Sequence, residues 1–345
     1  MFNLFFNSNN NELNNSKNKK VDENVIICGI VKNVQVHIHK SLEFCIKTGE
    51  MFNDYKIVIY ENNSVDGTKN ILKNYEKEMN NHFKIICEDL DKDEIKNKSR
   101  CWAYTKITGS DHPCRIEQIS NARNKVISEI RKEEYNKYTY VIWIDLDTNY
   151  YCVDGILDSF NKRQKCNWDV VYANGLEKNL VNYYDKYAYR DGKNFLFGPE
   201  VIGEHFWNLV KHNNISFVGN NDLIPIISGF GGIGIFKKDI FNKYNYDCIV
   251  SDSIIKYYSN LLNEVNIDKH LDEVISNPCK KFPGGYKSLY KIKKEGNEEI
   301  KWIHWKNNCG YDNVIICEHA HLNLTLINDG YKLFINPKMI YIWNN

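Results

Sequence analysis

The stretch YVIWIDLDTNYY, residues 140–151, decides the expected fold because a strand-like run ends in two acidic residues. Residues 141–144 are β-branched or aromatic, as in a strand that is buried on both faces. Asp145 and Asp147 follow directly, one residue apart. Two like charges this close repel each other, so we expect a positive group between or beside them.

Strand-like and helix-like segments alternate through the first half of the chain. This alternation is typical of a mostly parallel sheet with helices on both faces, in which ligands bind beyond the carboxyl ends of the strands. We therefore predict an α/β, Rossmann-like fold with a decorated C-terminal half. The predicted strands cover residues 25–31, 55–61, 83–88 and the segment from 140 onward, and the last helix between them covers residues 116–135.

The second half of the chain has a less regular pattern. Residues 223–241 are apolar but contain four glycines, which indicates a bulge or the close approach of another backbone or ligand. Residues 250–310 mix helical and basic-polar segments and are interpreted as an insertion or lid. Residues 316–337 predict a helix with strand-like ends. Without a repeat or a linker, we expect one domain over residues 24–345, after a disordered Asn- and Lys-rich tail at residues 1–23.

Composition excludes several classes of protein. The 45 basic and 44 acidic residues nearly cancel, which argues against a nucleic-acid-binding protein. The eleven cysteines form no CxxC pair, which favours free thiols in a reducing compartment over a zinc ribbon. No apolar run approaches the roughly 20 residues that span a bilayer, and the N-terminus lacks the features of a signal peptide. We expect a soluble cytoplasmic protein without a transmembrane segment.

The aspartate pair is interpreted as a metal site. A hard divalent cation such as Mn²⁺ or Mg²⁺ takes oxygen ligands, and a diphosphate-bearing substrate would complete its coordination. The ends of two other predicted strands carry polar residues that would meet the pair at the same sheet edge: Lys32, Asn33, Glu61, Asn62 and Ser64. A second DLD at residues 89–91 lies in a run of charges and is interpreted as solvated surface.

The sequence resembles glycosyltransferases of the GT-A fold, in which a DxD follows the fourth strand. YENNSVDGT (residues 60–68) resembles the segment after the second strand that lines the nucleotide pocket. RIEQISNARN (residues 115–124) is similar to the helix that faces the donor, and residues 317–337 are similar to the EDxxLxxRLxxxGYKIxxxP ending. More narrowly, YENNSVDGT, NARN (residues 121–124), YYDKYAYRDGK (residues 183–193) and SGFGGIGIFK (residues 228–237), in this order, resemble CAP59-like α-mannosyltransferases.

The resemblance implies a metal-dependent, hexosyltransferase-like enzyme. It would use a nucleotide-diphosphate sugar as donor and a glycan, glycoprotein or other hydroxyl compound as acceptor. The nucleotide sugar would bind residues 24–150 and the acceptor would bind residues 151–345. Many relatives have Glu-Asp, with the Asp as catalytic base, where this chain has Glu318-His319, and Thr325 replaces an expected arginine. Retaining and inverting outcomes therefore both stay open.

The same resemblance suggests individual roles. Asp147 would bind the metal directly, and Asp145 would contact the ribose or a metal-bound water. His319 or His321 would approach the metal or the diphosphate. The donor site would be formed by Lys32, Asn33, Glu61, Asn62, Ser64 and Arg123, with Glu61 on the base or ribose and Arg123 facing the phosphates. Glu318 and Asp222 are the candidate catalytic carboxylates.

Alternatives stay open at this point. Glu318 would otherwise cap the helix that follows it, with the two histidines on the surface, and Arg123 would pair with an acid such as Glu129. Arg190 and Asp191 fit a turn-stabilising pair as well as an acceptor contact. A nucleotidyltransferase or a non-catalytic carbohydrate-binding protein on the same scaffold are the competing functions. The first usually has a Gly-rich basic loop after the first strand, whereas CGIVKNVQVH has one glycine and one lysine.

Overall fold

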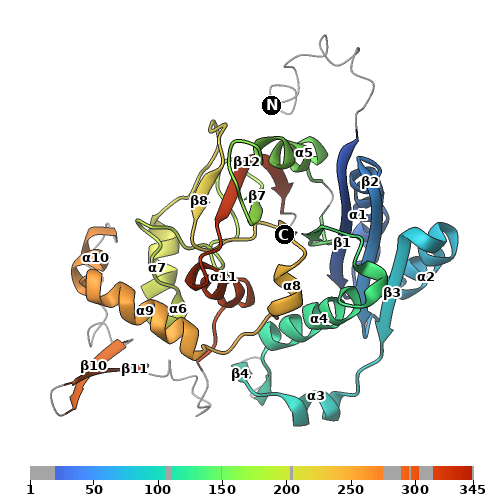
Figure 1. Cartoon of the computed structure of the whole chain (residues 1–345). Helices are drawn as coiled ribbons and strands as arrows, with labels where there is room; N and C mark the ends of the chain where they lie inside the picture. Colours follow the sequence, from blue (N-terminus) through green and yellow to red (C-terminus); the bar gives the residue numbers. More distant parts are fainter. Residues whose placement is uncertain are drawn as a thin grey trace.

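The computed structural model describes residues 20–105, 110–148, 150–202, 205–274, 289–294, 297–302 and 314–343. Its centre is an eight-stranded sheet in the order β3-β2-β1-β6-β9-β7-β12-β8 (Figure 1). These strands are β1 (Val21–Val31), β2 (Phe52–Asn62), β3 (Phe83–Glu88), β6 (Tyr140–Ile144), β7 (Val170–Leu176), β8 (Ile224–Ile226), β9 (Ile233–Lys237) and β12 (Leu333–Ile342).

The sheet is mostly parallel. The pairs β3–β2, β2–β1, β1–β6 and β7–β12 are parallel, whereas β9 runs antiparallel to both β6 and β7. Strand β8 is antiparallel to β12 at one edge. The carboxyl ends of six strands therefore lie along one edge of the sheet, and the predicted α/β fold of the GT-A type is confirmed.

Helices cover both faces of the sheet, and strand alternation explains why. In β6, Val141 and Trp143 pack into the cluster that contains α4 (Arg115–Ile130) and α11 (Glu318–Asn328). Ile142 and Ile144 point the other way, into the cluster that contains α1 (Gln35–Glu50), α2 (Thr68–Met79) and α5 (Val153–Lys162). A strand that is apolar on both sides is what a two-faced α/β layer requires.

The remaining elements surround this three-layer core. Those of the first half are η2 (Asn80–His82), α3 (Lys92–Lys98), β4 (Trp102–Thr105), β5 (Ser110–Pro113) and η3 (Glu133–Tyr135). Those of the second half are α6 (Pro199–Ile202), α7 (His205–His212), α8 (Ile240–Lys243), α9 (Asp252–Glu264), α10 (Ile267–Val274), β10 (Leu289–Lys294) and β11 (Asn297–Trp302). No helix in the described ranges is both long and apolar enough to cross a bilayer.

Several boundaries differ from the sequence prediction. Strand β1 starts at Val21, because Val21 already pairs with Phe52, so residues 21–23 of the predicted tail are strand and residues 1–19 lie outside the described part. The predicted lid at residues 250–310 contains α9 and α10, and α9 packs against α11. Within that lid, residues 275–288, 295–296 and 303–310 lie outside the described ranges.

The glycine-rich segment forms a tight turn before β9. Gly231 and Gly232 have positive φ angles of 64° and 87°. A Cβ on Gly231 would lie 2.4 Å from the Ala173 carbonyl oxygen, and one on Gly232 would lie 2.5 Å from the Tyr341 ring. The predicted close backbone approach is confirmed, since this turn packs directly against β7 and β12.

Candidate functional site

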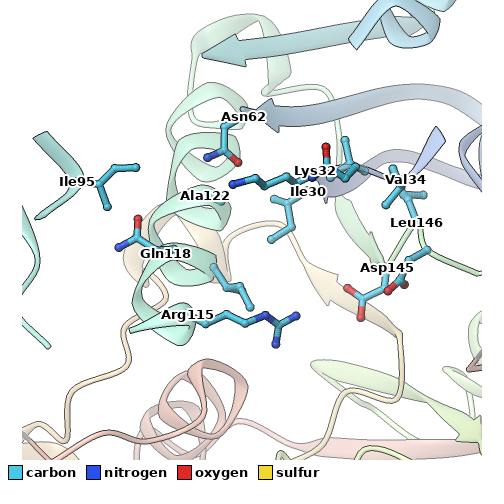
Figure 2. A pocket seen from close by; sticks show the side chains of 14 residues that line it. Ile30, Lys32, Val34, Asn62, Ile95, Arg115, Gln118, Ala122, Asp145 and Leu146 are labelled. Atoms are coloured by element: carbon cyan, nitrogen blue, oxygen red, sulfur yellow. The ribbon is translucent and has the colours of Figure 1, made fainter. Parts of the chain in front are cut away.

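A pocket of about 570 Å³ opens at the carboxyl ends of the parallel strands (Figure 2). Its polar lining includes residues that the sequence analysis expected to converge: Lys32 and Asn33 after β1, Asn62 at the end of β2, and Asp145 and Asp147 after β6. The convergence of three strand ends is therefore confirmed. The wall opposite comes from the first turns of α4, where Arg115, Gln118 and Ala122 line the same pocket.

Arg115 is a pocket residue that the sequence analysis did not single out. Its side chain is exposed and extends across the pocket toward Asp145 (Figure 2). It is the first residue of α4, so a basic residue at the start of the helix that follows the β4–β5 hairpin was the available signal. The pocket thus has a cationic side chain facing a carboxylate across open space.

Hydrogen bonds join the loop after β1 to the loop after β2. The Asn33 N–H donates to Ser64 Oγ at 3.0 Å, and the Val65 N–H donates to Asn33 Oδ1 at 2.8 Å. Glu61 has no exposed surface, and its oxygens accept from the Ser64 N–H at 2.8 Å and the Cys87 thiol at 2.9 Å. The structure thus places Glu61 and Ser64 behind the pocket as loop supports, whereas the expected contact of Glu61 with a base or ribose would need exposed carboxylate surface.

The two aspartates are anchored from the C-terminal half of the chain. The Tyr341 hydroxyl in β12 donates to Asp147 Oδ1 at 3.1 Å, while the side chain of Asp147 is otherwise exposed. The Asp145 N–H donates to the Gly232 carbonyl oxygen at 2.9 Å. The first half of the chain supplies the carboxylates, and the second half fixes their position.

Arg123 lies behind Asp145 instead of facing the pocket. It is only 3% exposed, and its Nη2 is 3.4 Å from Asp145 Oδ1 and 3.0 Å from His319 Nε2. Its Nε is 3.7 Å from Glu318 Oε1. Three aromatic rings enclose the guanidinium at 5.1–5.3 Å: Trp143, Phe230 and Tyr246. Instead of the predicted position facing donor phosphates, Arg123 contacts Asp145, Glu318 and His319, and the alternative pairing with Glu129 does not form.

The two C-terminal histidines do not join the aspartates. His319 stacks on Phe230 at 3.8 Å between ring centroids, and burial together with Arg123 lowers its pKa well below the usual value. Its Nε2 therefore accepts from Arg123 and is not open to a metal. His321 faces the charges of Asp247 and Arg100 instead. The prediction that either histidine approaches the metal is not supported, because α11 turns both rings into neighbouring contacts.

The donor set still fits a hard divalent ion. Within the described ranges no three His, Cys, Asp or Glu side chains are grouped to hold a metal, so the two aspartates are the candidate ligands among these side chains. One or two carboxylates completed by substrate phosphates and water is the usual arrangement for Mg²⁺. Burial raises the pKa of Asp145 to about 7, with Asp147 acting in the same direction and Arg123 opposing it. A carboxylate that burial makes hard to ionise is one that a bound cation would stabilise.

The two candidate catalytic carboxylates lie in different places. Glu318 is the first residue of α11, is 7% exposed, and points toward Arg123. Asp222 is exposed and precedes edge strand β8; its neighbour Asn221 accepts a bond from Lys162 at the end of α5. Strand β8 is the edge of the sheet, separated from β6 by β9, β7 and β12, so Asp222 lies away from the strand-end pocket. The structure does not bring Asp222 to the site.

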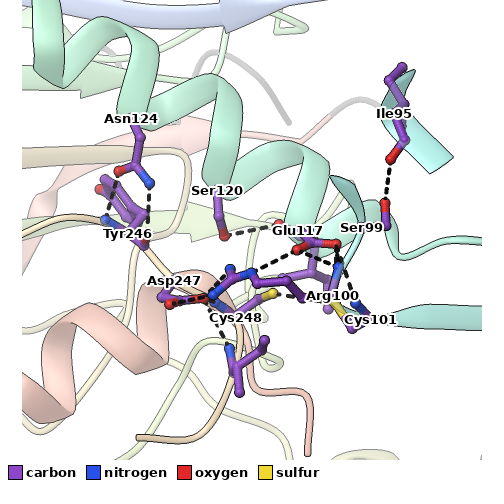
Figure 3. A network of polar contacts seen from close by, with 12 residues as sticks. Ile95, Ser99, Arg100, Cys101, Glu117, Ser120, Asn124, Tyr246, Asp247 and Cys248 are labelled. Carbon is purple, nitrogen blue, oxygen red and sulfur yellow. Dashed lines mark hydrogen bonds and ion pairs between the residues drawn. The ribbon is translucent and has the colours of Figure 1, made fainter. Parts of the chain in front are cut away.

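A second pocket of about 500 Å³ adjoins the first and shares Asn62, Ile95, Gln118 and Ala122 with it. Arg100 lines this second pocket and joins Glu117 of α4 to Asp247 through contacts of 3.0 and 2.8 Å (Figure 3). This network fixes the first turn of α4, and with it Arg115, against the C-terminal half. The pocket wall is therefore held from both halves of the chain.

Comparison with known proteins gives one match over most of the chain. The family described as Cryptococcal mannosyltransferase 1 matches residues 30–272. No curated protein matches the chain. The order of motifs that the sequence analysis compared with CAP59-like α-mannosyltransferases falls largely within the matched range.

Solved structures match the chain at low similarity. Residues 1–349 of S. aureus TarS match with 12% identity and a TM-score of 0.36, over 65% of this chain and 50% of that one. The mannosyltransferase PcManGT from Pyrobaculum calidifontis, in complex with GDP-Man and Mn²⁺, matches with 10% identity and a TM-score of 0.36, over 66% and 48%. GalNAc-T7 with UDP, GalNAc and Mn²⁺ matches with 9% identity and a TM-score of 0.45, over 94% and 45%. The chain spans about half the length of these proteins.

Proposed function

This chain belongs to the Cryptococcal mannosyltransferase 1 family, and from this premise we propose that it is a metal-dependent glycosyltransferase. It moves a sugar from a nucleotide-diphosphate sugar to a hydroxyl group of a glycan, glycoprotein or other acceptor. One observation carries the proposal. Asp145 and Asp147 line a single strand-end pocket together with the cationic side chains of Lys32 and Arg115.

Different residues of this pocket would bind the metal, the phosphates and the nucleoside. Mn²⁺ or Mg²⁺ would be held by Asp147 and Asp145, and it would neutralise charge on the departing diphosphate. Lys32 and Arg115 lie in the same pocket, and Arg115 offers a planar donor fork that suits phosphate oxygens. Asn62 supplies an amide to the nucleoside side of the pocket. Arg123 fixes Asp145 from behind, because its Nη2 lies 3.4 Å from the carboxylate.

The test is a panel of sugar nucleotides, with and without metal. Thermal unfolding is measured with GDP-mannose, UDP-glucose, UDP-galactose and UDP-N-acetylglucosamine, each with MnCl₂ or with excess EDTA. The proposal expects at least one to stabilise the protein only when metal is present, since a ligand that binds the native state raises the unfolding temperature. Release of nucleoside diphosphate from that donor should stop in EDTA and resume with added Mn²⁺.

Three results would contradict the proposal. Full turnover in excess EDTA would remove the metal from the mechanism. Tight metal-dependent binding without any release of nucleoside diphosphate, with simple sugars supplied as acceptors, would favour a non-catalytic carbohydrate-binding protein. Release of pyrophosphate when a nucleoside triphosphate and a sugar phosphate are supplied would favour a nucleotidyltransferase.

A further inference from the structure

Asp185 lies at the same sheet edge as Asp145, although neither sequence position nor motif links them. After β7 the chain turns back, so that Tyr183 bridges Leu176 and the Tyr184 N–H donates to the Gly175 carbonyl at 2.9 Å. This return brings Asp185 to the carboxyl end of β7. Since β7 and β6 are separated only by β9, Asp185 and Asp145 come from neighbouring parts of one edge.

One dipeptide joins the Asp185 carboxylate to the main chain of Asp145. The Gly231 N–H donates to Asp185 Oδ2 at 3.1 Å, and the carbonyl of the next residue, Gly232, accepts from the Asp145 N–H at 2.9 Å. Because neither glycine tolerates a Cβ, this turn sits in one position against β7 and β12. The Asp185 side chain and the Asp145 main chain are therefore both held by the same glycine turn.

Asp185 differs from the other carboxylates near the site in what surrounds it. Glu318 is 7% exposed and is directed at Arg123, and Asp147 is bound by the Tyr341 hydroxyl. Asp185 is partly exposed, and its hydrogen-bond donors are the backbone N–H groups of Gly231 and Ala188. Burial raises its pKa to about 6, which the two backbone donors oppose. Its carboxylate is thus fixed in orientation by backbone donors, in a residue that is partly exposed.

The nucleotide pocket lies on the opposite side of Asp145. That pocket is lined from β1, β2 and α4, whereas Asp185 follows β7, on the other side of β6 in the sheet. Aromatic pairs flank Asp185 in the chain: Tyr184 stacks on Trp343 at 5.3 Å, and Tyr187 stacks on Trp207 at 6.0 Å. Trp207 is 51% exposed. Broad aromatic faces on residues that flank a carboxylate in the chain fit the C–H faces and hydroxyl groups of a sugar acceptor.

We propose that Asp185 is the catalytic carboxylate that binds the acceptor hydroxyl and takes its proton. This inference rests on the proposed glycosyl transfer. The acceptor oxygen forms a bond to the anomeric carbon of the donor sugar, and the bond from that carbon to the diphosphate oxygen breaks. The electron pair of the broken bond leaves with the nucleoside diphosphate, and the hydroxyl proton moves to Asp185.

The decisive variant is Asp185→Asn, because the asparagine carbonyl can still accept the hydrogen bond from Gly231. A purely structural role would therefore leave turnover close to wild type. A role as proton acceptor predicts that turnover of the donor found in the sugar-nucleotide panel falls by about 100-fold or more. The dissociation constant for the matching nucleoside diphosphate with Mn²⁺ should stay within about twofold, since Asp185 lies outside the nucleotide pocket.

The matched control is Asp239→Asn. Asp239 is exposed and follows β9 at the end of the sheet where Tyr140 of β6 pairs with Lys237, far from the carboxyl edge. Its turnover should equal that of wild type. If Asp185→Asn fails to fold, Asp185→Ser replaces it, because a serine hydroxyl can also accept from Gly231, and the same 100-fold loss is expected.

The possible results distinguish a wrong role for Asp185 from a wrong proposed function. If wild type turns over no sugar nucleotide, the proposed function fails and the role of Asp185 fails with it. If wild type is active and the variant keeps more than a third of its turnover, the role of Asp185 alone is overturned. A variant that loses nucleotide affinity as strongly as turnover would assign Asp185 to the donor site and also overturn the inference. Recovery of turnover in Asp185→Ser by added formate would support it directly.

Discussion

Arg123 and Arg190 are both buried arginines with a carboxylate partner, yet their surroundings differ. Arg190 is fully buried, and its Nη2 donates to both oxygens of Glu200 at 3.0 and 3.1 Å. Its Nη1 donates to the carbonyl oxygens of Tyr187 and Tyr189 at 3.0 and 2.7 Å. The Tyr258 hydroxyl adds a further bond to Glu200.

Around Arg123 the carboxylate contacts are longer. Asp145 and Glu318 lie at 3.4 and 3.7 Å, and the shortest contact is the one at 3.0 Å to His319. Arg123 also borders a pocket through Asp145, whereas Arg190 joins the loop after β7 to α6 and α9 inside the core. A buried ion pair with several short contacts fixes a packing arrangement. A cation with long contacts beside a pocket can strengthen one of them when a ligand binds.

Loss of Arg190 should have the largest effect on stability. Arg190→Met leaves the Glu200 carboxylate buried without its cation, and we expect the free energy of unfolding to fall by about 3–5 kcal/mol. Urea unfolding measures this, and the affinity of the remaining folded protein for nucleotide should not change. The double variant Arg190→Met, Glu200→Gln should recover much of the loss. A loss below about 1 kcal/mol in the single variant would show that the Arg190–Glu200 pair does not fix the packing.

The next effect belongs to the pocket and should appear in activity, not stability. Asp147→Asn removes a metal ligand, so we expect turnover of the sugar nucleotide to fall by about 100-fold or more while the free energy of unfolding changes by less than about 0.5 kcal/mol. The chain offers its own control in Asp91 of the other DLD. Sequence analysis interpreted that run as solvated charge, but Asp91 caps α3 by accepting from the N–H groups of Asp93 and Glu94.

Asparagine caps helices about as well as aspartate, so Asp91→Asn should leave both turnover and stability nearly unchanged. Similar loss of turnover in Asp91→Asn and Asp147→Asn would contradict the assignment of the strand-end pair.

Arg123→Met tests the other side of the comparison. We expect a smaller loss of stability than for Arg190→Met, because Asp145 keeps contact with water, and a fall in turnover of about tenfold. Arg123 lowers the pKa of Asp145 against the effect of burial, so its removal should raise that pKa above about 7. Mn²⁺ affinity, measured by titration in the presence of nucleoside diphosphate, should therefore fall more at pH 6.5 than at pH 8.5. An equal fall at both pH values would show that Arg123 does not act through the charge of Asp145.

The smallest effect concerns His319 and is a change in how the free energy of unfolding depends on pH. The pKa of His319 lies well below 6.5 in the folded protein. Below pH 6.5 the ring is therefore protonated in the unfolded chain while it is still neutral in the folded one. The stability contributed by the neutral ring is thus present above pH 6.5 and is lost as pH falls below it. In His319→Gln this dependence disappears. The stability gap between wild type and variant should shrink by about 1.4 kcal/mol from pH 7.5 to 5.5 in urea unfolding. A constant gap would indicate a protonated ring in the folded state.

The N-terminal half was predictable because its signals are local. Each strand of that half is bounded by turn residues, and polar side chains follow it directly, so the meeting of Lys32, Asn62 and Asp145 follows from parallel topology alone. Strand β7 was missed because Asn174 and Gly175 interrupt its apolar run, although both are accommodated by tertiary contacts: Asn174 bonds the Pro337 carbonyl, and Gly175 lies against Gly231.

The C-terminal side of the site could not be predicted from the sequence, because its geometry also depends on tertiary contacts. The direction of His319 depends on Phe230 and Arg123, which are distant in the chain. Asp185 gains its position from a hydrogen bond to Gly231, 46 residues later. Asp222 is acidic and close to the glycine turn in sequence, but β8 carries it to the edge of the sheet. Pattern reasoning identifies a residue's chemistry, whereas its direction is set by partners from other elements.

The insertion of β9 between β6 and β7 also has a consequence for synthesis on the ribosome. Strands β1, β2, β3 and β6 can pair as soon as residue 144 has emerged, but the partner that covers the free edge of β6 ends at Lys237, roughly ninety residues later. At about 5–20 residues per second, that edge stays open for several seconds or longer. An unpaired, fully apolar strand is a template for pairing with other chains. Nascent protein should therefore be most dependent on chaperones in this interval, and a translational pause between residues 145 and 237 should lower the soluble yield more than one placed after β9.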